Sequence, residues 1–149
     1  LRHALRQGTA EPLEAESLAL TLVCRSLGPR TTHATQATQG RRRLVDRVKV
    51  LLASDLSRQW KLADIAAEIG GSPVYLTQAF QQVGGGPLHR YHLRLRLARA
   101  LDGLAHCEDV SALAMDLGFS SHSHFTAAFK QAYGRTPSAF RASALAKHA

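Results

Sequence analysis

The sequence has few cysteines, few aromatic residues and no long apolar run. Its two cysteines, Cys24 and Cys107, are far apart and neither belongs to a Cys-x-x-Cys pair, so no zinc or redox motif is indicated. A reducing, cytoplasmic setting is the default expectation for such a chain. No apolar stretch approaches the roughly 18 residues that a membrane span needs. No signal peptide is visible either, so we expect no membrane association.

Patterns that carry catalytic or metal chemistry are also missing. Gly84-Gly85-Gly86 has neither the preceding strand nor the following lysine of a phosphate-binding loop. His122 and His124 would diverge by about 200° on a helix, so they cannot chelate one ion together. His89 and His92 are i,i+3 neighbours, but no carboxylate or cysteine pattern completes a metal site. We therefore expect no enzyme activity, no cofactor and no metal.

The composition has a clear surplus of positive charge. Nineteen Lys and Arg residues oppose 11 Asp and Glu, which gives a formal net charge of +8. Residues 1–40 contribute +1 of this charge and residues 41–149 contribute +7. Such a surplus suggests a polyanionic partner, most commonly nucleic acid, although a merely soluble basic surface would look the same. The chain begins with Leu1 rather than Met, so we expect it to be a piece of a longer protein.

The most informative stretch runs from Val110 to Arg141. Its first part places apolar side chains at helical spacing, and Gly118 then allows the positive φ that ends a helix. Ser121 can cap a second helix, whose apolar stripe contains Phe125 and Phe129. Two short helices joined by a tight turn form a helix-turn-helix motif. A short helix with an apolar back and a polar, partly basic front fits the major groove of DNA.

An earlier stretch, Trp60–Val83, repeats this pattern. Ser72 can cap its second helix and Pro73 takes the first helical position, where proline is tolerated. Trp60 is expected to pack against the preceding helix, with base stacking as the minor alternative. The matched pairs are Ile65/Leu113, Ala66/Ala114, Ile69/Leu117, Gly70/Gly118, Leu76/Phe125, Phe80/Phe129 and Gly85/Gly134. Small residues at the alanine pair let the two helices of each motif cross closely.

The remaining segments predict three further helices, a linker and a tail. A helix over residues 13–27 has an apolar stripe of Ala15, Leu18 and Leu22, which it cannot bury alone. It is expected to pack on a missing domain or on a second copy, or else to be a frayed leftover. Residues 28–40 contain no large aliphatic side chain and predict a flexible linker. Helices are expected over residues 41–57 and 88–104, and residues 142–149 form a tail.

Residues 41–141 resemble the DNA-binding region of the AraC/XylS family of bacterial transcription regulators. The resemblance is carried by Leu117-Gly118-Phe119-Ser120-Ser121, Ser123-His124-Phe125, Phe129-Lys130, Tyr133-Gly134, Thr136-Pro137, Phe140-Arg141, Arg96-Leu97, Ala100, Ile65-Ala66, Ser72, Leu76 and Phe80. It implies an all-α, homeodomain-like fold of about seven helices. Two helix-turn-helix subdomains would be joined by a long connecting helix, with two recognition helices on one face of the duplex.

The resemblance also implies partners. Residues 1–27 would be the last piece of an N-terminal sensing and often dimerising domain, through which any small-molecule effector would act. RNA polymerase would be contacted during activation. Three positions depart from the family pattern: Gln78 and Ala127 stand where an arginine is frequent, and Pro87 stands where a Ser or Thr cap is usual.

These patterns assign candidate contacts to double-stranded DNA. Gln78 can pair bidentately with adenine, and the Ala127 methyl can pack on thymine. Arg96 has a rival role, which is to pair with an acidic side chain between the subdomains. The expected base contacts are Val74, Thr77, Gln78, His122, Ser123, Thr126 and Ala127. The expected phosphate contacts are Ser72, Gln81, Arg94, Arg96, Ser121, Lys130 and Arg135.

The sequence thus predicts a sequence-specific DNA-binding transcription regulator, more often an activator than a repressor, acting in the bacterial cytoplasm at the nucleoid. The alternative is a helical interaction module for an acidic partner protein. That alternative explains the charge but not the duplicated motif.

Overall fold

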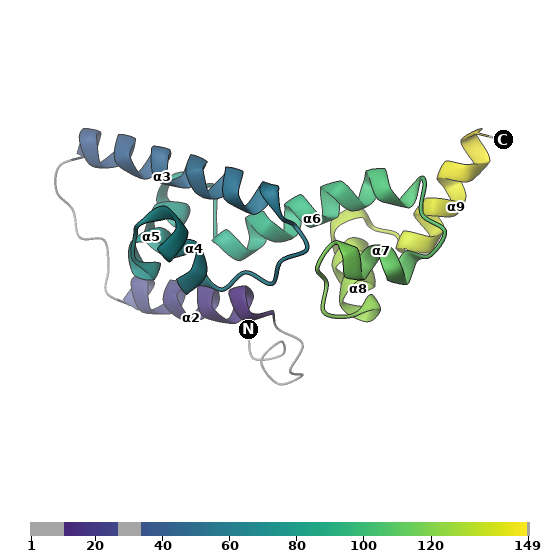
Figure 1. The fold of residues 1–149 in the computed structure, drawn as a ribbon, viewed down its shortest axis with the longest axis horizontal. Coiled ribbons are helices and arrows are strands. Elements are labelled where there is room, and N and C mark those ends of the chain that lie inside the picture. Colours follow the sequence, from purple (N-terminus) through teal and green to yellow (C-terminus); the bar gives the residue numbers. More distant parts are fainter. Residues whose placement is uncertain (1–10, 27–33, 149) are drawn as a thin grey trace. The chain divides into compact units, whose positions relative to one another are not determined.

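The fold of the chain was analysed in a computed structural model that describes residues 11–26 and 34–148 (Figure 1). In these residues every regular element is an α-helix, which confirms the predicted all-α class. The elements are α2 (Pro12–Ser26), α3 (Ala34–Ser54), α4 (Leu62–Ile69), α5 (Pro73–Val83), α6 (Leu88–Leu104), α7 (Val110–Asp116), α8 (His122–Tyr133) and α9 (Pro137–His148). None of these helices is both long and apolar enough to cross a membrane.

The helices form two compact units. The first contains α2 to α5 and the start of α6, up to His92. The second contains the rest of α6, together with α7 to α9 and the short segment 56–58. The long helix predicted over residues 88–104 is therefore present with those bounds and contributes residues to both units.

The first unit is built around the helix-turn-helix of α4 and α5. Helix α3 packs on both, and the core includes Val48, Leu52, Ile65 and Phe80, all fully buried. The Trp60 side chain is also buried, and its Nε1 donates a hydrogen bond to the Asp55 carbonyl at 3.0 Å. This burial confirms a packing role for the tryptophan and excludes base stacking in this arrangement.

The second unit repeats this construction with α7 and α8. Asp109 caps α7 by accepting a hydrogen bond from the Ser111 N–H at 2.7 Å. The rings of Phe119, Phe125 and Phe129 are buried and pack in series, with centroid separations of 4.9 and 5.7 Å. The apolar residues predicted for the back of α8 therefore form the centre of this unit.

Two predicted irregular segments are helical instead. Helix α3 begins at Ala34, so residues 34–40 of the predicted linker are helical, while residues 28–33 lie outside the described part of the chain. Alanine and glutamine favour helix, and a helix can tolerate the one glycine, Gly40. Helix α9 continues to His148, so the predicted tail is helical over residues 142–148. No helix-breaking residue follows Pro137.

Helix α2 buries a different face from the one predicted. It packs on α4 and α5 of the first unit, and its buried residues are Leu13, Ser17 and Thr21. Leu22 belongs to the predicted apolar stripe, yet it is 48% exposed. In this structure the helix docks on the first helix-turn-helix motif, a contact within the chain that the sequence pattern did not predict.

Candidate nucleic-acid interface

The first motif presents a polar helix behind a tight turn. Gly70 ends α4 in the left-handed conformation with φ of 70°, and Ser72 caps α5 by accepting from the Tyr75 N–H at 3.2 Å. Val74 is 43% exposed, and Gln78 is half-buried on the same helix. The Ser72 hydroxyl, the Val74 side chain and the Gln78 amide thus belong to one short helix whose opposite side forms the core.

Two side chains predicted to contact DNA are covered in this motif. Thr77 is only 3% exposed, and its hydroxyl donates to the Pro73 carbonyl at 2.9 Å. The Gln81 Nε2 is buried and has no hydrogen-bond partner among the described residues. In this arrangement neither the Thr77 hydroxyl nor the Gln81 amide nitrogen is available to a duplex, which corrects their predicted accessibility.

The second motif gathers the predicted polar residues at the start of α8. Ser121 caps this helix by accepting from the His124 N–H at 3.0 Å. His122, Ser123 and Ala127 are exposed, and Thr126 is half-buried. Helical geometry places His122, Ser123 and Thr126 near one another, because they are one, three and four residues apart.

His122 is held between two hydroxyl groups. Its Nδ1 lies 3.2 Å from the Ser111 Oγ of α7, and its Nε2 lies 3.3 Å from the Thr126 Oγ1 of α8. Because both ring nitrogens are engaged, the imidazole has a defined orientation at the first turn of α8. Ser111 was not among the predicted site residues, although its place 11 residues before the histidine, across a short turn, allows such a contact.

Three of the predicted basic phosphate contacts are exposed. These are Arg94 on α6, Lys130 in the last turn of α8 and Arg135 beyond its end. The Arg135 guanidinium lies over the Phe140 ring, 5.1 Å from its centroid, so its plane is supported while its edge stays accessible. All three of these cations belong to the second unit.

The prediction that Arg96 contacts phosphate is wrong. Its side chain is 1% exposed, with Nε donating to the Leu56 carbonyl at 2.9 Å and Nη2 donating to the Arg58 carbonyl at 3.1 Å. The guanidinium also lies 5.8 Å from the centroid of the Phe119 ring. The side chain therefore has a structural role in this arrangement, through two backbone carbonyls of segment 56–58, and its predicted pairing with an acidic side chain stays a prediction.

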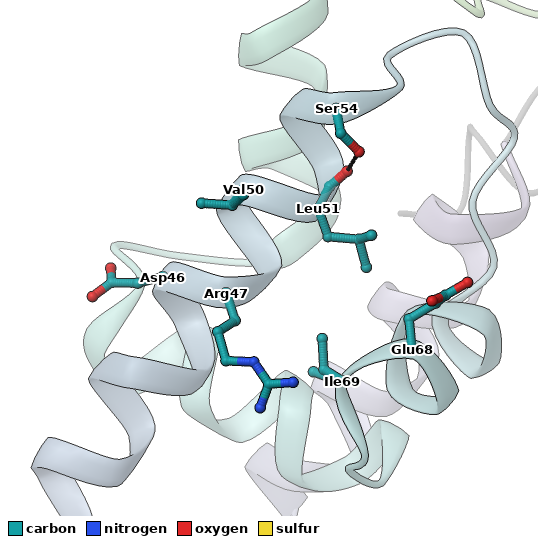
Figure 2. A pocket seen from close by; sticks show the side chains of 7 residues that line it. All are labelled: Asp46, Arg47, Val50, Leu51, Ser54, Glu68 and Ile69. Atoms are coloured by element: carbon teal, nitrogen blue, oxygen red, sulfur yellow. Dashed lines mark hydrogen bonds between the residues drawn. The ribbon is translucent and has the colours of Figure 1, made fainter.

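The first unit also has a hollow, which is lined by none of these residues. It has a volume of about 520 Å³ and is lined by Asp46, Arg47, Val50, Leu51, Ser54, Glu68 and Ile69 (Figure 2). Leu51 and Arg47 from α3 and Ile69 from α4 point toward its interior, and the Ser54 hydroxyl donates to the Leu51 carbonyl at 2.7 Å. Charges of both signs line the hollow, so it does not share the basic character expected of a surface that binds phosphate.

The two motifs have the properties that define helix-turn-helix DNA-binding domains. Each has a glycine turn, a serine-capped second helix and an apolar back beneath an exposed polar side. The family model described as "Helix-turn-helix domain" matches residues 65–143. The chain belongs to the AraC/XylS family of DNA-binding transcription regulators, which are not enzymes.

Curated relatives agree with this assignment. The chain is 33% identical over 141 residues to the transcriptional activator RhaR of Klebsiella pneumoniae, which covers 94% of this chain and 48% of RhaR. It is 30% identical over 117 residues to the regulatory protein PocR of Salmonella typhimurium, covering 76% and 39% of the two chains. The chain thus spans at most about half the length of these relatives.

Solved structures share the fold. An AraC-type transcriptional regulator from Chromobacterium violaceum is 27% identical, with a TM-score of 0.65 over 71% of this chain and 96% of that one. The DNA-binding domain of AdpA, solved in complex with a target DNA, has a TM-score of 0.65 over 69% of this chain and 94% of its own. Its identity to this chain is 22%, so this likeness concerns the fold alone.

Proposed function

We propose that the chain is the DNA-binding part of a sequence-specific transcription regulator, with α5 and α8 as recognition helices in two adjacent major-groove segments. The observation that carries this proposal is the duplication of one motif. Gly70 and Gly118 have φ of 70° and 79°, and Phe80 and Phe129 are both fully buried. A repeated arrangement with a polar side on each second helix suits two successive groove segments better than it suits one partner protein.

Different side chains would perform different parts of the recognition. On α5, Gln78 would read adenine and Val74 would contact a thymine methyl. On α8, His122, Ser123 and Thr126 would contact base edges, and Ala127 would pack on a methyl group. The caps Ser72 and Ser121, with Arg94, Lys130 and Arg135, would bind phosphates and set the register of the protein on the duplex.

The regulatory context is proposed from the relatives. RhaR is described as a transcriptional activator, and we propose activation through RNA polymerase for this protein. A sensing domain preceding the present residues would bind a small-molecule effector and support dimerisation, and residues 1–27 would be its last piece. The protein would act in the bacterial cytoplasm at the nucleoid. A helical module for an acidic partner protein is less favoured, because it leaves the repeated motif unexplained.

Binding of the chain to duplex DNA should depend steeply on salt. If about six phosphates are neutralised, log K should fall against log salt with a slope near −5. Fluorescence anisotropy with a labelled random 30-base-pair duplex, repeated at several salt concentrations, measures this slope. An acidic protein without nucleic acid serves as the competitor control. Equal affinity for both, with no salt dependence, would show that DNA is not the partner.

Replacing Gln78 and Lys130 should have distinguishable effects. Gln78→Ala should relax the preference at one base position, at a cost of about 1–3 kcal/mol for the preferred base. Lys130→Ala should weaken all sequences alike and reduce the salt slope by about 1. Selection of bound sites from random DNA, followed by titration of single-base variants, measures both effects. Identical profiles for the two variants would refute the division of roles.

A further inference from the structure

Helix α2 lies on the side of α5 that α3 leaves free. Helices α4 and α5 are drawn between α3 and α2 in Figure 1, and both α2 and α3 contact α5. The apolar stripe of α5, formed by Leu76, Ala79 and Phe80, is fully buried in the core. Helix α2 thus contacts α5 from the side away from α3.

The flank next to this stripe carries the covered polar residues. Thr77 and Gln81 are one turn apart, so they lie on the same side of α5. The Thr77 side chain is 3% exposed, and the Gln81 Nε2 is buried without a partner among the described residues. A second helix of a helix-turn-helix motif normally offers such polar side chains to the groove. Here they are withdrawn from solvent on a helix that also carries Gln78.

The face that α2 turns inward is unusually polar. Leu13 is buried at the start of the helix, but the other two buried side chains are Ser17 and Thr21, at 1% and 6% exposure, whereas Leu22 and Val23 are 48% and 50% exposed. The Thr21 Oγ1 has no hydrogen-bond partner in the described residues. A helix that belongs permanently to a core buries its large apolar side chains and satisfies its polar ones. The contact between α2 and α5 has the character of a reversible interface.

Two polar anchors hold α2 in place. The Glu16 Oε2 accepts a hydrogen bond from the Leu62 N–H at 2.6 Å, and Lys61 provides no side-chain cap at this end of α4. The Ser17 Oγ lies 3.2 Å from the His89 Nδ1 at the start of α6. Burial lowers the pKa of His89, so this ring is neutral near pH 7 and can share one hydrogen bond with the serine.

The charge of α2 suits a competitor of DNA. Residues 11–26 contain Glu11, Glu14 and Glu16 against one basic residue, Arg25, in a chain with a net charge of +8. The Glu16 carboxylate accepts a hydrogen bond from a backbone N–H at the start of α4. A phosphate oxygen of DNA can accept a hydrogen bond from the same kind of N–H group. Helix α2 thus offers the first unit an anionic contact of the kind that a duplex would offer.

We propose that α2 is an autoinhibitory element that competes with duplex DNA for the flank of α5 carrying Thr77 and Gln81. This inference rests on the proposed DNA-binding function. In the docked state the first motif has part of its groove-facing side covered. Release of α2 uncovers Thr77 and Gln81 and frees the Leu62 N–H at the start of α4. If the released state makes up about 10% of the molecules, the apparent affinity for DNA is about tenfold below that of the open form.

Cysteine labelling can report the position of α2 directly. Cys24 lies on α2 and is half-buried, while Cys107 lies in the second unit and serves as an internal reference. We expect a random 30-base-pair duplex at low salt to raise the maleimide labelling rate of Cys24 severalfold relative to Cys107. Unchanged or slower labelling of Cys24 in a chain that binds the duplex would overturn the autoinhibitory role.

A charge-neutral substitution tests the same contact through affinity. Ser17→Leu places a bulky side chain on the buried face of α2, whereas Ala19→Leu makes the corresponding change at an exposed position. We expect Ser17→Leu to bind the duplex about tenfold more tightly than the parent chain, and Ala19→Leu to bind like the parent. Circular dichroism checks that both variants remain folded.

A second pair of variants covers the case in which Ser17→Leu fails to fold. Glu16→Gln weakens the anchor to Leu62, and Glu14→Gln removes an equal charge from the same helix without touching that anchor. The first should gain more affinity than the second. An equal gain in affinity for both variants would mean that the effect comes from net charge alone. That outcome would overturn the autoinhibitory role of α2 but not the proposed DNA binding. If neither the parent chain nor any variant binds the duplex, the proposed function fails as well.

Discussion

Gly118→Ala is expected to lower the free energy of unfolding by about 2–5 kcal/mol, whereas Gly70→Ala should cost only about 1–2 kcal/mol. The two glycines occupy matching positions in the two motifs and have similar φ angles, 79° and 70°. The strain of placing an L-residue in the left-handed region is therefore common to both. The difference between the variants comes from what surrounds each turn.

The surroundings of the two turns are very different. A Cβ at Gly118 would lie 2.7 Å from the Ser57 carbonyl oxygen, 2.8 Å from the Leu56 carbonyl oxygen and 2.6 Å from the Arg96 Nη2. A Cβ at Gly70 would meet no atom within 4 Å. Because two of the atoms at Gly118 belong to the backbone, they cannot move aside as the end of a flexible side chain would. Overpacking of this kind adds to the strain.

Urea unfolding followed by circular dichroism measures both variants. The two units can unfold in separate transitions, so the tryptophan fluorescence of Trp60 in the first unit should be followed alongside the helical signal. Gly70→Ala should shift the fluorescence transition slightly, and Gly118→Ala should shift mainly the transition of the second unit. Equal losses in the two variants would show that segment 56–58 does not restrict the second turn.

The duplicated motif could be predicted from the sequence because its signals are local. Gly70, Gly118, Ser72 and Ser121 each act on the turn or helix start where they stand, and each has the predicted role. Helix α6 was predicted with its observed bounds because its apolar residues recur over 17 positions. Such features depend on spacing over a few residues, which the sequence displays directly.

The contacts that the sequence did not reveal join residues far apart in the chain. Glu16 meets Leu62 across 46 positions, and Arg96 meets Leu56 across 40. A pattern of 3.6-residue periodicity identifies the apolar face of α2, but it cannot show that Ser17 and Thr21 are the side chains buried against α5. Likewise, an arginine on an amphipathic helix is expected at the surface unless its partners are known.

The bounds of α3 and α9 were missed for a different reason. Residues 34–40 contain no large apolar side chain and residues 142–148 contain a single one, Leu145, yet both segments are helical. Residues 34–40 lead directly into the part of α3 that packs in the core, and residues 142–148 directly follow the part of α9 that packs on the second unit. Extending an existing helix avoids the cost of nucleating a new one.

Arg96→Ala should be among the most destabilising single substitutions in the second unit, at about 3–5 kcal/mol. The side chain is among the largest that are fully buried, so its removal leaves a cavity. It also leaves the carbonyl oxygens of Leu56 and Arg58 without the donors that now lie at 2.9 and 3.1 Å. The loss should appear in unfolding experiments without DNA, because the interactions lie within the protein.

Arg94→Ala is the matched control, since Arg94 lies on the same helix but is exposed. It should change stability by no more than about 0.5 kcal/mol, while weakening DNA binding at every sequence and flattening the salt dependence by about one unit of slope. Arg96→Lys keeps the charge but lacks the planar fork that reaches two carbonyls, so it should restore only part of the lost stability.

The pair separates the two roles that an arginine on α6 can have. If Arg96→Ala unfolds at the denaturant concentration of the parent chain but loses affinity and salt slope, the side chain contacts phosphate as the sequence alone suggested. If stability falls while Arg94→Ala loses only affinity, the connecting helix has two functions on neighbouring turns. Arg96 then holds segment 56–58 against the second motif, and Arg94 binds the duplex that this motif recognises.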